Sequence, residues 1–179
     1  HPSSWAIKYY TIFSGQALSI FGSGLVQFAL VWFLTQKTGS ATVLAMATLV
    51  AMLPQVIFGP LVGALVDRWN RRLIMIMADS FIALATVILA ILFASGLVEI
   101  WHIYIILFLR AIGDTFHWSA MGASTALLVP SDQLTRVSGI NQVLRSGVNI
   151  IAPPTAALLL DVLPIQGILA IDVSTALLG

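Results

Sequence analysis

The residues with the clearest chemical potential are Arg110, Asp114 and His117, which follow one another at helical spacing inside an apolar stretch. A charge in the middle of a membrane costs about 2.5–3.5 kcal/mol, so it usually faces a protein interior or a water-filled pathway. Arg110 and Asp114 are one turn apart and can form an ion pair of structural value only. Alternatively, Asp114 is a protonatable carboxylate and our first candidate for a proton carrier. His117 can titrate near neutrality, or it can serve only as a hydrogen-bonding residue.

Other charged residues also lie in apolar stretches. Arg145 has no acid near it on its own segment and therefore needs a partner from another one. Asp172 is an acid that likewise needs a partner from another segment, and we take it as the second candidate proton carrier. Asp79 and Asp161 lie nearer the ends of their segments, where we expect them to snorkel to the interface or to cap a helix. The proton-coupling candidates are Asp114, Arg110, Asp172 and His117.

Polar residues recur at intervals of three and four in three of the apolar segments, which places them on one face of each predicted helix. The three stripes are Gln16, Ser19, Ser23 and Gln27; Arg110, Asp114, His117 and Met121; and Ser138, Asn141, Arg145 and Asn149. Such stripes predict a shared, water-accessible substrate cavity. Its candidate residues are Gln16, Ser19, Ser23, Gln27, Met121, Asn141, Arg145 and Asn149. The alternative is that these side chains only join helices through hydrogen bonds, each worth about 0.6 kcal/mol.

The composition predicts that helices crossing a membrane position these residues. Of the 179 residues 59% are hydrophobic and 8% are charged, against roughly 25% charged residues in soluble domains. A membrane helix needs about 20 mostly apolar residues. We therefore predict an all-α polytopic membrane protein whose six spans lie at roughly 10–34, 43–66, 73–95, 102–129, 137–162 and 166–179. The chain begins at His1 and stops at Gly179 within an apolar run, so we expect a fragment with a truncated sixth span.

The absence of familiar motifs narrows the function. There is no cysteine, which excludes disulfides and thiolate metal sites. The sequence also lacks a Walker loop, a GxSxG or HExxH motif and a nucleotide fingerprint. We therefore predict neither an enzyme nor a cofactor, a metal or a nucleic-acid partner.

The basic residues outside the spans predict the orientation. Those on the N-terminal side are Lys8, Arg68, Arg71, Arg72 and Arg136, against Lys37 alone on the other side. Basic loops stay in the cytoplasm. We expect a multi-pass protein of the plasma or inner membrane whose N-terminus and loops 67–72 and 130–136 are cytoplasmic.

The charged loop between the second and third spans carries a family resemblance. Gly63, Asp67, Arg68, Arg71 and Arg72 match the G-x-x-x-D-R-x-G-R-R signature of the major facilitator superfamily. Asn70 replaces the second glycine, and because Asn tolerates left-handed backbone, we expect the turn to survive. Arg110-Ala-Ile-Gly113 is similar to a family element of the fourth span. The stretch from Gly147 to Pro153-Pro154 resembles a degraded antiporter motif.

The chain looks most similar to the macrolide-efflux-like proteins of the drug:proton antiporter group within that superfamily. The sequence segments that support this resemblance are 34–40, 58–60 and 170–173. The resemblance implies twelve helices in two halves, each made of two inverted three-helix repeats. This chain, 1–179, would be the N-terminal bundle, without the C-terminal half. The loop residues Gly63, Asp67, Arg68, Arg71 and Arg72 would then act as a conformational latch against that half.

The resemblance implies proton-coupled efflux of an amphiphilic drug, such as a macrolide, by alternating access. The expected partners are a small amphiphilic substrate, protons, the lipid bilayer and the missing half. One alternative is the export of another amphiphile, such as a siderophore or a lipid. Another is a membrane receptor or assembly protein that keeps the fold and transports nothing.

Overall fold

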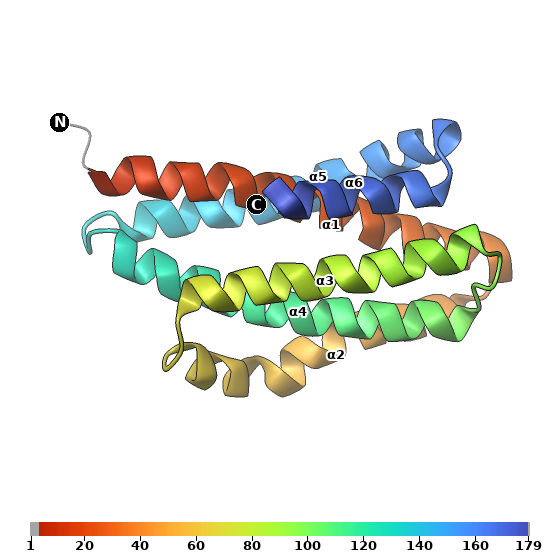
Figure 1. Ribbon diagram of the computed structural model, residues 1–179, viewed down its shortest axis with the longest axis horizontal. Coiled ribbons are helices and arrows are strands. Elements are labelled where there is room, and N and C mark those ends of the chain that lie inside the picture. Colours follow the sequence, from red (N-terminus) through yellow and green to blue (C-terminus); the bar gives the residue numbers. More distant parts are fainter. Residues whose placement is uncertain (1–3, 179) are drawn as a thin grey trace.

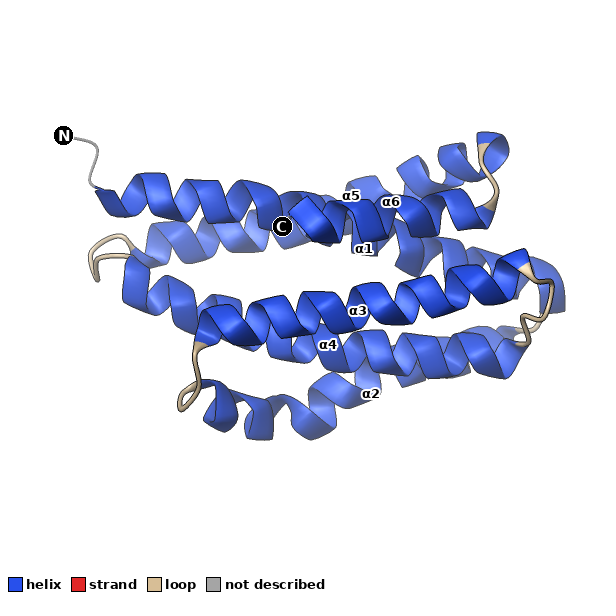
Figure 2. Ribbon diagram, viewed as in Figure 1, coloured by secondary structure: helices blue, strands red, loops and turns tan. Residues whose placement is uncertain are grey.

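The computed structural model describes residues 4–178, which form six helices and contain no strand. The helices are α1 (Ser4–Thr38), α2 (Ala41–Val66), α3 (Arg71–Ala94), α4 (Ile100–Leu128), α5 (Leu134–Val162) and α6 (Ile165–Leu178). Consecutive helices run antiparallel along one bundle (Figure 1), and the loops are confined to its two ends (Figure 2). The predicted all-α, six-helix architecture is confirmed. The Lys8 side chain and Gly179, which entered the predictions, lie outside the described part of the chain.

Helix length and surface both suit a membrane. In the described part of the chain, four helices are long and apolar enough to cross one, over Tyr9–Thr38, Ala41–Val66, Arg71–Ala94 and Leu134–Val162. α4 is as long as α5, with 29 residues. It is not among these four candidate spans, and it carries the polar stripe of Arg110, Asp114 and His117. Large apolar side chains cover the outside, and Val56 on α2 and Ile150 on α5 are 74% and 72% exposed. Such a surface needs lipid or another apolar surface against it. The chain is a multi-pass membrane protein.

The helices pack in a pattern that repeats between the two halves of the chain. α4 packs against α2 and α3, while α1 packs against α5 and α6. α3 also contacts α6, which joins the two groups. Exchanging α1–α3 with α4–α6 turns this set of principal contacts into itself. That symmetry is what two intertwined three-helix repeats produce.

Two glycines allow the close helix approaches on which the interior depends. A Cβ on Gly113 of α4 would lie 2.5 Å from Ile82 Cγ1 on α3. A Cβ on Gly22 of α1 would overlap Thr175 Oγ1 and lie 3.2 Å from the Asp172 Cα on α6. Small residues are the usual means by which membrane helices bring their backbones together. These contacts fix α3 beside α4 and α6 beside α1, which are two of the three helices that carry the polar stripes.

The turn between α2 and α3 is shaped by a helix cap. Asn70 has φ −68° and ψ 109°, and its Oδ1 accepts hydrogen bonds from the backbone N–H groups of Arg72 and Leu73, at 3.1 and 3.4 Å. Within residues 4–178, only glycines have a positive φ. The expectation of a left-handed Asn70 was therefore wrong. The side chain satisfies the first turn of α3 instead.

Candidate functional site

A buried ion pair joins α4 to α6 in the middle of the bundle. Arg110 Nη1 lies 2.6 Å from Asp172 Oδ2, and both side chains are almost completely buried. The Ser23 hydroxyl of α1 donates to Asp172 Oδ1 at 2.9 Å, and the Thr86 hydroxyl of α3 donates to Oδ2 at 3.1 Å. Arg110 also contacts the Thr86 oxygen. One carboxylate thus connects four helices, and the two buried charges compensate each other.

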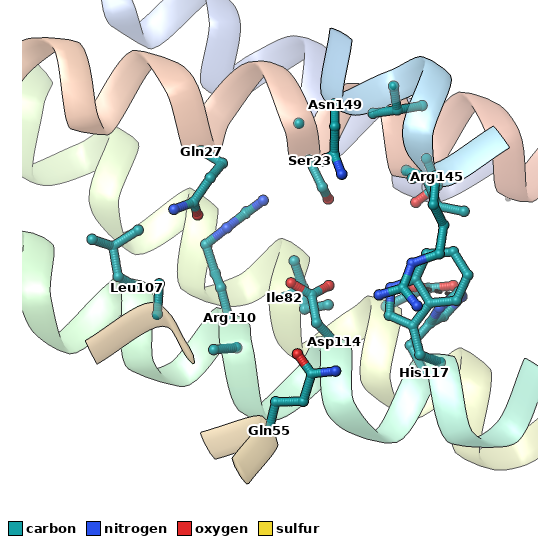
Figure 3. Close-up of a pocket in the computed structure, with 18 of the residues that line it drawn as sticks. Ser23, Gln27, Gln55, Ile82, Leu107, Arg110, Asp114, His117, Arg145 and Asn149 are labelled. Carbon is teal, nitrogen blue, oxygen red and sulfur yellow. Dashed lines mark ion pairs between the residues drawn. The ribbon is translucent and has the colours of Figure 1, made fainter. Parts of the chain in front are cut away.

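This arrangement changes the predicted pairing of Arg110. The sequence places Asp114 one turn away from it, but the guanidinium binds Asp172, which is 62 residues distant in the chain. Asp114 takes part in no hydrogen bond or ion pair that the described residues supply, although its charge interacts with those of Arg110 and His117. Its carboxylate points into the cavity beside Arg110 (Figure 3). Asp114 is therefore the acid of this site that forms no hydrogen bond or ion pair with the described residues.

A cavity of about 440 Å³ lies beside the ion pair. Helices α1, α4 and α5 supply most of its polar lining, and α2 and α3 contribute one polar residue each. The polar lining residues are Ser19, Ser23, Gln27, Gln55, Asp79, Arg110, Asp114, His117, Trp118, Arg145 and Asn149. Figure 3 shows labelled members of this set, such as Ser23, Asp114 and Arg145, extending into the cavity from different helices. The three stripes thus do contribute to one shared cavity.

A second cluster links α1, α3 and α4 at one end of this cavity. His117 Nε2 lies 3.6 Å from Asp79 Oδ1 and contacts Gln16 Oε1. Asp79 lies in the third turn of α3, so the expectation that it caps or snorkels at a helix end was wrong. Asp161 is exposed in the last turn of α5, where the sequence placed it.

Arg145 has an aromatic partner. Its guanidinium carbon lies 4.0 Å from the centre of the Trp118 ring, which is the geometry of a cation–π contact. Among residues 4–178, Arg145 belongs neither to the Arg110–Asp172 ion pair nor to the contact between His117 and Asp79. We expected Arg145 to have a partner on another helix. That partner is the indole ring of Trp118 and not an acid.

The charged groups around the cavity do not balance. The carboxylates are Asp79, Asp114 and Asp172, and the guanidiniums are Arg110 and Arg145. With His117 neutral, these three acids and two bases leave one negative charge. A proton or a bound cation can neutralise it, and an uncompensated charge in such surroundings is expensive. The chemistry open to this site is the uptake of a proton or of a cation.

The remaining candidate residues lie elsewhere. Gln16 and Met121 line a second cavity of about 1,060 Å³, which also touches Arg71 and Arg72 at the α2–α3 end of the bundle. Asn141 accepts a 2.8 Å hydrogen bond from the Tyr9 hydroxyl. Ser138 is exposed.

Two residues of the predicted latch, Asp67 and Arg68, face outward. Asp67 and Arg68 are exposed, and Asp67 forms no ion pair with any residue that the structure describes. A Cβ on Gly63 would meet nothing within 4 Å. Asp67 and Arg68 are therefore turned away from the bundle, whereas Arg71 and Arg72 line the second cavity.

Sequence reasoning missed Thr86 and Gln55, which lie in apolar segments without a polar stripe. It also missed Trp118, which directly follows His117 of the α4 stripe. In the part of the chain that the structure describes, no group of three or more potential metal ligands is found.

The comparisons with known proteins agree with this architecture. The family model described as Major Facilitator Superfamily matches residues 12–179. Macrolide efflux protein A of Streptococcus pyogenes is 46% identical over 177 residues, which cover 99% of this chain and 44% of that protein. The protein of the same name from Enterococcus faecalis is 46% identical over 141 residues, or 79% of this chain and 43% of its own length. An uncharacterized MFS-type transporter of Bacillus subtilis, YkuC, is 23% identical over 166 residues, which cover 92% of this chain and 38% of YkuC.

The chain thus spans less than half the length of the curated relatives that it matches. No solved structure matches it. The match along nearly the whole chain, together with the six-helix bundle and its repeat-like packing, leads to one conclusion: the chain belongs to the major facilitator superfamily.

Proposed function

We propose that this chain forms the first half of a proton-coupled exporter of amphiphilic drugs, with macrolides as the leading substrate class. The single observation that carries the proposal is the polar cavity inside an apolar bundle, which has one carboxylate more than its arginines balance. The name shared by the relatives at 46% identity supports the substrate class. The Streptococcus pyogenes relative is more than twice as long as this chain, which suggests a second half of similar size. In this proposal the two halves together open the cavity alternately to each side of the membrane.

Asp114 is the proposed proton carrier. Asp172 is committed to Arg110, Ser23 and Thr86, and Asp79 is next to His117. Asp114 lacks such contacts and faces the cavity, so a proton can reach it without breaking an ion pair.

The orientation follows the basic loops. We place the N-terminus and loops 67–72 and 130–136 in the cytoplasm because arginines gather there. In this arrangement the exposed Asp67 and Arg68, together with Gly63, face the second half and act as the latch that stabilises one access state. Arg71 and Arg72 line the cavity at the same end of the bundle.

The test is drug accumulation in inside-out membrane vesicles that contain the full-length protein. With an acidic lumen we expect the wild type to accumulate a labelled macrolide, and Asp114→Asn to lose the part that depends on the gradient. Asp161→Asn is the matched control, because that carboxylate is exposed at the end of α5. Equal accumulation by wild type and Asp114→Asn would remove Asp114 from the proton role. If no drug accumulates in response to the gradient, the chain serves as a receptor or an assembly protein instead.

A further inference from the structure

The second unusual feature of the cavity is a guanidinium that rests on an aromatic ring without a carboxylate to balance it. Arg145 extends from α5 across the cavity and covers the face of Trp118 on α4. Neither of the ion pairs in the described residues includes Arg145. Removing a cation from water without an anion partner is unfavourable unless the new site attracts it. The Trp118 face is therefore already functioning as a cation site, and a residue of the protein occupies it.

Asp114 stands on the same face of α4, one turn before Trp118. Both residues line the 440 Å³ cavity, whose size lies within the range of roughly 300–1,000 Å³ typical of pockets for drug-sized ligands. A carboxylate next to an aromatic face is the combination that proteins use to hold an organic ammonium group. Arg145 satisfies only the aromatic part of that combination, because Asp114 forms no ion pair with it.

From this geometry we infer that Trp118 and Asp114 form a binding site for the cationic group of an organic ligand, and that Arg145 occupies its aromatic face until the ligand displaces it. The inference rests on the proposed export function and specifies the chemical class of its substrate: an amphiphile bearing a protonated or quaternary amine. The ligand cation stacks on Trp118 and neutralises Asp114. Arg145, which is only partly buried, swings away from the ring toward the cavity opening.

If the ligand displaces Arg145, substitutions of the site residues and of Arg145 should change the affinity for the cation in opposite directions. Trp118→Leu removes the aromatic face and Asp114→Asn removes the counter-charge, so both weaken cation binding. A cation–π contact worth about 0.5–2 kcal/mol corresponds to a change of roughly two- to thirtyfold in affinity. Arg145→Gln removes both the competing occupant and a like charge, so it strengthens cation binding. A purely structural role of Arg145 would not produce that sign.

The experiment is equilibrium binding of tetraphenylphosphonium to the purified full-length protein in detergent, without any gradient. Tetraphenylborate serves as the matched probe, because it has the same shape with the opposite charge. We expect Trp118→Leu and Asp114→Asn to weaken phosphonium binding, and Arg145→Gln to tighten it. Trp118→Phe should keep most of the affinity because it keeps an aromatic face. Trp101→Leu is the control, since that exposed tryptophan lies at the other end of α4.

Two results would overturn the inference. One is phosphonium affinity that does not change in Trp118→Leu and Arg145→Gln. The other is borate binding that depends on Arg145, which would make the site one for anions. If Trp118→Leu does not fold, Arg145→Gln decides the matter, because it leaves the Trp118 ring in place and removes only the charge that covers it. Failure of the export function is recognised separately, since vesicles would then show no gradient-driven accumulation while equilibrium binding is unaffected.

Discussion

Replacing Asp172 by asparagine should destabilise the bundle more than any exposed substitution. The Arg110 and Asp172 side chains are 4% and 2% exposed, so the guanidinium would remain buried without its counter-charge. Breaking a buried pair by removing one partner costs about 3–5 kcal/mol. A hydrogen bond between membrane helices is worth only about 0.6 kcal/mol. Asparagine has one acceptor oxygen in place of two, so it can keep the hydrogen bond from Ser23 or the one from Thr86. Most of the loss therefore measures the charge.

The assay is the free energy of unfolding of the purified full-length protein, obtained by titration with sodium dodecyl sulfate. Asp161→Asn is the control and should change that free energy by less than about 0.5 kcal/mol. A double variant, Arg110→Leu with Asp172→Leu, should recover much of the loss, because removing both charges leaves nothing uncompensated. The reasoning is refuted if Asp172→Asn is as stable as Asp161→Asn. It is also refuted if the double variant loses as much as the two single variants together.

Three further stability changes follow from the packing, and the same titration measures them. Gly113→Ala should cost about 1–3 kcal/mol, because the new Cβ would lie 2.5 Å from Ile82; Gly63→Ala, which adds a Cβ in open space, should be neutral, and equal losses would contradict the α3–α4 approach. Gly22→Ala should be at least as harmful as Gly113→Ala, since backbone atoms of α6 lie in the way; unchanged stability would show that α1 and α6 are farther apart. Asn70→Ala should cost about 1 kcal/mol and Asn70→Gly only a few tenths; a larger loss for glycine would contradict the capping role.

The elements and the cavity were largely predictable from the sequence, because both follow from local patterns. Continuous apolar runs separated by turn residues determined the six helices. Residues such as Ser23, Asp114 and Asn149 met in one cavity because helical spacing determines which face they occupy. Orientation of a stripe toward a shared interior is the only arrangement that avoids placing charges in lipid.

The partners of the charges were not predictable, because they depend on how distant helices pack. Arg110 has an acid one turn away in the sequence, yet it binds Asp172 on α6. Trp118 is an apolar residue beside the polar stripe of α4 and gives no signal of its own, and only the approach of α5 makes it the partner of Arg145. Asp79 was assigned to a helix end from its place in the chain alone, and only the packing of α3 on α4 brings it to His117.

The most direct test of the central claim is the number of protons released when the full-length protein binds a macrolide in weakly buffered detergent solution. If Asp114 holds the proton that balances the cavity, binding of a cationic substrate releases about one proton per ligand from the wild type. Asp114→Asn should bind without releasing it, while Asp161→Asn should behave as the wild type does. Binding by the wild type without proton release, or undiminished release from Asp114→Asn, would contradict the account.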